Sequence, residues 1–92
     1  MATLHILFQF ENENEWHSVH PTRDCPLLKG NEAVENPFTL SNEIWDCIEA
    51  ELKRKHLSHK RVDRDSVIVE IDTDDGKHIV VPKDVVLKCF DQ

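Results

Sequence analysis

The chain has 92 residues, of which 39% are hydrophobic, and carries 11 lysine and arginine residues against 18 aspartate and glutamate residues, a net charge of −7. This length fits a single domain, residues 1–92, and the apolar content is too high for a disordered chain. The acidic balance argues against a surface-wide grip on nucleic acid or on a membrane, because phosphate groups would be repelled. Cys25, Cys47 and Cys89 are too few and too widely spaced for a disulfide scaffold, so we expect reduced thiols in a cytoplasmic protein.

The N-terminal segment predicts a β-strand. Leu4, Ile6, Phe8 and Phe10 alternate with other residues at a period of two, which is typical of a half-buried strand. Residues 16–20 predict a second short strand. Trp16 is either an exposed interface anchor or, as we prefer for so small a domain, a residue that closes the core. Residues 21–38 contain three prolines and a glycine, and they predict a loop.

The clearest predicted element is a helix in the middle of the chain. Its apolar row at four-residue spacing is Leu40, Ile44, Ile48 and Leu52, flanked by Trp45 and Cys47. Thr39 or Ser41 is positioned to cap its start. Cys47 is expected in the core, and His56, which continues the row, is expected at the edge of the core.

A hairpin is predicted to follow. Residues 66–73 form a strand that places Val69 and Ile71 on one face, and residues 77–81 form the returning strand. The Asp75-Gly76 pair predicts a two-residue type I′ turn. With that turn Ile71 lies opposite Val80, and Val80 faces the core.

Residues 85–90 predict a short C-terminal helix, with a strand as the alternative because of their β-branched residues. The order of elements therefore predicts an α+β fold, in which a small antiparallel sheet, made of the N-terminal strand and the C-terminal hairpin, packs against one main helix.

Positive charge is concentrated in residues 53–64. This segment contains one acidic residue and six of the 11 basic residues, a local charge of +5 against −12 for the rest of the chain. Two histidines add positive charge below about pH 6.5. The candidate binding residues are Lys53, Arg54, Lys55, His56, His59, Lys60, Arg61 and Arg64.

Two interpretations of this segment stay open. In the first it is a solvated helix end, stabilised by the helix dipole or attracted to the acidic stretches at residues 11–15 and 72–75. In the second it is a patch that docks an acidic protein surface, which predicts a small protein-interaction module of the inhibitor, immunity or adaptor type. A nucleic-acid-associated regulator that uses the same residues is the alternative, and it is disfavoured by the overall charge.

A third hypothesis is a zinc-braced or catalytic protein. His17 and His20 are spaced as a metal-binding pair with Cys25 close by, and His56 and His59 have the same spacing. The chain lacks a C-x-x-C motif and a glycine-rich phosphate loop, so we expect no enzyme activity, no metal and no cofactor. A homodimer through an open sheet edge is a further expectation.

Overall fold

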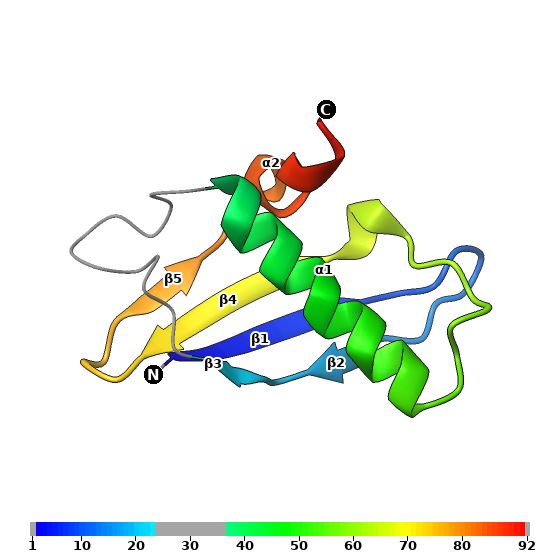
Figure 1. Cartoon of the computed structure of the whole chain (residues 1–92), viewed down its shortest axis with the longest axis horizontal. Coiled ribbons are helices and arrows are strands. Elements are labelled where there is room, and N and C mark those ends of the chain that lie inside the picture. Colours follow the sequence, from blue (N-terminus) through cyan, green and yellow to red (C-terminus); the bar gives the residue numbers. More distant parts are fainter. Residues whose placement is uncertain (1, 24–36, 92) are drawn as a thin grey trace.

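The computed structural model describes residues 2–23 and 37–91 and shows an antiparallel sheet with one long helix across one of its faces (Figure 1). The strands are β1 (Ala2–Phe8), β2 (His17–Val19), β3 (Thr22–Arg23), β4 (Ile68–Thr73) and β5 (His78–Val80). The helices are α1 (Pro37–Arg54), α2 (Lys83–Val86) and the 3-10 turns η2 (Arg64–Ser66) and η3 (Lys88–Phe90). The predicted α+β fold is confirmed.

The sheet has the order β2-β1-β4-β5, and β3 pairs with β1 on the same side as β2. The alternation along β1 is confirmed, because Leu4, Ile6, Phe8 and Phe10 are all at most 2% exposed. These side chains face α1, whose buried row is the predicted one. Within 2–23 and 37–91, no helix has the length and apolarity needed to cross a lipid bilayer.

The predicted register of the hairpin is wrong by one residue. Ile71 lies opposite Ile79 rather than Val80, and Val80 is 61% exposed on the face away from α1. The cause is the loop, in which Thr73 N donates to Lys77 O (2.9 Å) and Gly76 alone has a positive φ, of 85°. This three-residue connection replaces the type I′ turn, which needs a positive φ at both central positions, and one extra residue reverses the two faces of the returning strand.

Two further expectations, one about burial and one about the start of α1, are corrected. Trp16 is 51% exposed and does not close the core. The start of α1 is not capped by Ser41, because the helix begins at Pro37 and Ser41 lies one turn inside it, fully buried. Proline suits a first helical position because its missing N–H would have no partner there.

The C-terminal segment packs against the first half of α1 (Figure 1). The predicted helix at residues 85–90 is divided into α2 and η3. One buried hydroxyl group connects them to α1: Ser41 Oγ donates to Val86 O (2.6 Å) and accepts from Cys89 N (3.0 Å). Trp45 Nε1 donates to the same Val86 carbonyl (2.9 Å).

Candidate functional site

The basic segment begins where α1 ends in a left-handed residue. His56 has a φ of 59°, Leu57 N donates to Leu52 O (2.8 Å) and His56 N donates to Lys53 O (3.2 Å), which is a Schellman motif. Leu57 then packs against the core. His56 is therefore exposed instead of lying at the core edge, because the chain reverses direction at this residue.

The rest of the segment is tied to the sheet. Phe10 and Val62 form an isolated antiparallel bridge beyond the end of β1. Lys60 Nζ pairs with Glu13 Oε2 (2.9 Å) and lies 5.0 Å from the centre of the Phe10 ring. The acidic stretch at residues 11–15 thus holds one of the basic side chains, as the intramolecular interpretation predicts.

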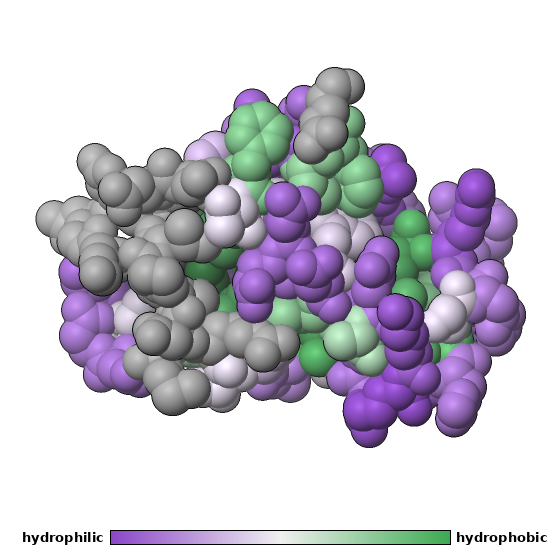
Figure 2. Space-filling view, viewed as in Figure 1, coloured by the Kyte–Doolittle hydropathy of each residue, from purple (hydrophilic) through white to green (hydrophobic). Residues whose placement is uncertain are grey.

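A hollow of about 810 Å³ lies between α1, the segment 58–65 and η3. Its apolar lining includes Trp45 and Leu52 from α1, Val62 from the segment and Phe90 from η3. Figure 2 shows apolar residues in a recess flanked by hydrophilic ones, on the side of the molecule where the α1–β4 connection lies. A volume of 300–1,000 Å³ is typical of ligand sites, so the hollow is large enough to take side chains of a partner.

Aromatic contacts form one wall of the hollow. The rings of Trp45 and Phe90 meet edge to face, with centroids 5.0 Å apart. The guanidinium of Arg64 lies over the Phe90 ring, 3.6 Å from its centroid, and Phe90 is still 39% exposed. Because Ser41 and Trp45 hold the C-terminal segment on α1, they also fix the position of this wall.

The structure divides the eight predicted binding residues into two groups. Four of them line the hollow: Lys53, Lys60, Arg61 and Arg64. The other four do not. Arg54 donates to the Glu51 carboxylate, Lys55 Nζ lies 3.9 Å from the same group, and His56 and His59 are exposed.

The charges around the hollow are balanced. Its lining also contains four acidic residues: Glu11, Glu49, Asp63 and Asp65. Lys53 and Arg61 are exposed and form no ion pair with any other described residue. The site is therefore an apolar recess with a rim of mixed charge rather than a uniformly basic patch.

The predicted zinc pair His17 and His20 is separated by the geometry of the strand. Residues three apart on a strand point to opposite faces. His17 stacks on Phe8 at 5.5 Å between ring centroids, whereas His20 lies against His5 on the other face. In the part of the chain that the structure describes, no three His, Cys, Asp or Glu side chains are placed to hold a metal ion.

Of the two cysteines that the structure describes, neither lines the hollow. Cys25 lies outside the described residues. Cys47 is 3% exposed, which confirms its predicted place in the core. Cys47 and Cys89 are both reduced, and neither forms a disulfide.

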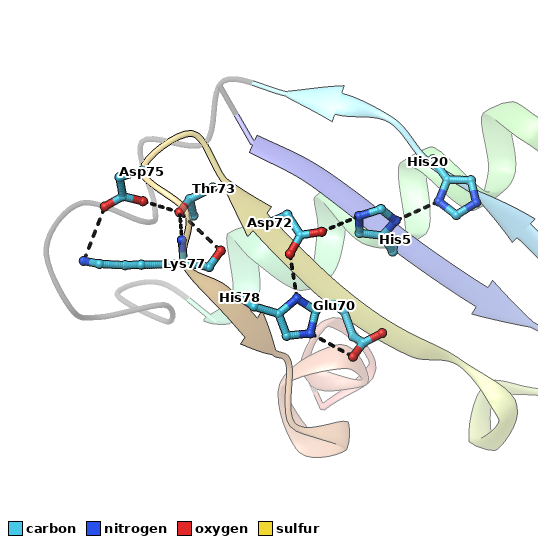
Figure 3. A network of polar contacts seen from close by, with 8 residues as sticks. All are labelled: His5, His20, Glu70, Asp72, Thr73, Asp75, Lys77 and His78. Atoms are coloured by element: carbon cyan, nitrogen blue, oxygen red, sulfur yellow. Dashed lines mark hydrogen bonds and ion pairs between the residues drawn. The ribbon is translucent and has the colours of Figure 1, made fainter.

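A second polar cluster lies on the sheet face opposite α1 (Figure 3). His5 Nε2 contacts Asp72 Oδ2 (2.8 Å), and His5 Nδ1 contacts His20 Nδ1 (3.0 Å). His78 lies between two carboxylates, with Nδ1 at 2.6 Å from Asp72 Oδ1 and Nε2 at 3.0 Å from Glu70 Oε1. The cluster joins β1, β4 and β5, and none of its members lines the hollow.

The contacts of His78 determine its protonation. A carboxylate only accepts hydrogen bonds, so His78 can donate to both carboxylates at once only in its imidazolium form, which carries a hydrogen on each ring nitrogen. The hydrogen bonds to Asp72 and then Glu70 accordingly raise the pKa of His78 above its ordinary value. The hydrogen bond from His78 in turn lowers the pKa of Asp72.

The sequence alone did not predict the hollow or the polar cluster on the open face of the sheet in full. The hollow depends on Phe90, which is far from residues 53–64 in sequence, and no local pattern connects them. The open-face cluster had a signal, because His5 is out of phase with Leu4 and Ile6, and Asp72 with Ile71. Period-two alternation places such residues on the face away from the core, but their pairing requires the strand order.

Comparison of the chain with protein-family models, with curated proteins and with solved structures finds no match in any of the three.

Proposed function

We propose that the protein is a small protein-interaction module, of the inhibitor, immunity or adaptor type, and that it docks its partner at the hollow between α1, residues 58–65 and η3. One observation carries the proposal: four of the basic residues line a single recess together with the exposed Phe90 and the partly buried Trp45 and Val62. Protein interfaces combine an apolar centre with a polar rim, and tryptophan and arginine are enriched among the residues that contribute most to binding.

Lys53 and Arg61 are the rim residues best placed to meet a partner's carboxylates. Both are exposed and without an ion-pair partner among the described residues. The balanced charge of the lining favours a protein over a polyanion, because the four carboxylates there would repel consecutive phosphates. The reduced state of Cys47 and Cys89 is consistent with a cytoplasmic location, which we propose as well.

The test is a pair of matched charge-reversal variants in an affinity purification from the source cells. Lys53→Glu with Arg61→Glu changes the rim of the hollow. Arg54→Glu with Lys55→Glu changes the same number of charges in the same segment, but at side chains outside the hollow that already contact Glu51. We expect proteins captured by the wild type and by the control pair to be lost from the rim pair, and their capture to weaken with salt.

Two results would contradict the proposal. In one, the rim pair retains the same proteins as the wild type. In the other, both pairs lose them equally, which would indicate a general effect of charge. Captured material that nuclease removes would instead support the nucleic-acid regulator.

A further inference from the structure

The hollow lies beside an open strand edge at Val62. Asp63 N donates to Gln9 O (2.8 Å), and Glu11 N donates to Arg61 O (2.9 Å). These two bonds flank the bridge between Phe10 and Val62. Phe10 and Val62 are therefore a non-hydrogen-bonded antiparallel pair, in which the N–H and C=O of each residue point away from the other chain. The backbone groups of Val62 are therefore directed outward, along the plane of the sheet.

These two groups have no hydrogen-bond partner in residues 2–23 and 37–91. β5 does not reach them, because it pairs with residues 70–72 of β4 and then leaves the sheet at Pro82. Val62 itself is half-buried and lines the hollow. An unpaired strand edge is a template for another extended chain, and here it borders a recess that can receive side chains.

The α1 side of the recess sets the length of its occupant. Trp45, Ile48, Glu49, Leu52 and Lys53 line it at helical spacing. At 1.5 Å per residue this stripe is about 12 Å long, which an extended chain covers in about four residues at 3.3 Å each. The site therefore suits a short extended segment.

We infer that the partner segment binds as an added β-strand that pairs with the main chain of Val62. Alternate side chains of this segment enter the recess against Trp45 and Phe90, and its polar side chains meet the mixed rim. Because acidic and basic rim residues are equal in number, the segment is expected to carry at least one apolar anchor and little net charge. The inference rests on the proposed function and specifies its mode of binding.

The experiment uses a phage-displayed library of random decapeptides as the probe and the full chain as the target. Val62→Pro removes the outward N–H and leaves every side-chain charge in place. Proline is tolerated at strand edges where the N–H faces outward, and the extended conformation it imposes on the preceding residue suits a bridge, so the variant is expected to fold.

Val80→Pro is the matched control. Val80 is also a valine at a strand edge, and its N–H also points outward, because Val81 N donates to Val69 O (2.9 Å) next to the pair formed by Glu70 and Val80. It belongs to β5 and does not line the hollow. The control therefore separates strand addition at the hollow from pairing along the edge of β5.

We expect peptides enriched on the wild type to bind Val62→Pro at least tenfold more weakly and to bind Val80→Pro unchanged. In the complex the Val62 amide should exchange with deuterium more slowly than in the free protein. N-methylation of one peptide amide should remove binding. The last two measurements do not depend on the folding of the proline variant.

Three results would overturn the inference. The library yields no enriched peptide, or the Val62 amide is not protected, or Val62→Pro binds as the wild type does. If binding survives Val62→Pro but is lost in Lys53→Glu with Arg61→Glu, docking at the hollow stands and only strand addition fails. If none of these substitutions weakens the binding of the selected peptides, the proposed function fails as well.

Discussion

Replacing Ser41 by alanine is expected to detach the C-terminal segment from α1. The Ser41 side chain is fully buried, and its hydroxyl is the partner of both Val86 O and Cys89 N. The substitution removes both hydrogen bonds. Loss of the bond to Val86 O costs about 1 kcal/mol, and loss of the bond from Cys89 N leaves this partly buried N–H without a partner, which costs about 1–2 kcal/mol more. Val86 O keeps its bond from Trp45 Nε1, so no further loss is expected there.

The expected loss in the free energy of unfolding is therefore about 2–3 kcal/mol. For a domain of this size, 1 kcal/mol corresponds to about 4–8 °C, so Tm should fall by roughly 10–20 °C. Urea unfolding followed by circular dichroism measures the free energy directly. Ser18→Ala is the control, because Ser18 is exposed on β2 and its replacement should change stability by less than about 0.5 kcal/mol.

A second readout distinguishes a local from a global effect. Cys89 lies within η3, next to Phe90, so loosening of this segment should increase the rate at which the Cys89 thiol is alkylated. Combining Ser41→Ala with Trp45→Phe leaves Val86 O without a donor, so the loss in the double variant should exceed the sum of the single losses. A loss below about 0.5 kcal/mol, with Cys89 alkylated at the wild-type rate, would refute the reasoning.

Three other predictions follow from single features of the structure. His56→Gly should stabilise the protein by about 0.5–1 kcal/mol in urea unfolding, because His56 occupies a left-handed conformation that glycine adopts without strain; a loss of stability would contradict this. Gly76→Ala should destabilise the protein by about 1 kcal/mol, because Gly76 has a φ of 85° that alanine adopts only with strain, although the added methyl group meets open space. An unchanged midpoint of urea unfolding would count against this. Asp72→Asn should lower the pKa of His78 in an NMR titration. The His78–Asp72 pair stabilises the fold fully below the ordinary His78 pKa of 6.5, and this stabilisation is lost as the pH rises through the raised pKa of His78. It is also lost at low pH, as the pH falls from the ordinary Asp72 pKa of 3.8 through the lowered pKa of Asp72. The stability difference between wild type and Asp72→Asn should thus be largest between pH 4 and 6.5, and a difference that grows above pH 8 would contradict the assignment.

The elements of the fold were predictable because each has its own local pattern. The period of two from Leu4 to Phe10 and the four-residue row from Leu40 to Leu52 identify which side chains are buried, and the structure confirms both. The register of the hairpin was not predictable in the same way. Whether Ile79 or Val80 faces the core depends on the conformation of a single loop residue, which the sequence Asp75-Gly76 does not determine.

The candidate site was only partly predictable for a different reason. The charge of residues 53–64 is a local property, so the segment was found from the sequence. Its division into rim residues such as Arg61 and paired residues such as Arg54 depends on contacts with Glu51 and on the position of Phe90. These contacts are set by packing between distant parts of the chain, which composition and spacing do not encode.

The short open edges of this sheet have a consequence for its behaviour at high concentration. β5 is three residues long and is followed directly by Pro82, and the bridge at Val62 involves one residue of each chain. Growth of a cross-β fibril needs about six consecutive residues that stack in register, with no proline among them. Neither of these edges offers such a run, and β2 at the opposite edge is also only three residues long, so these edges are not expected to template fibrillar aggregation.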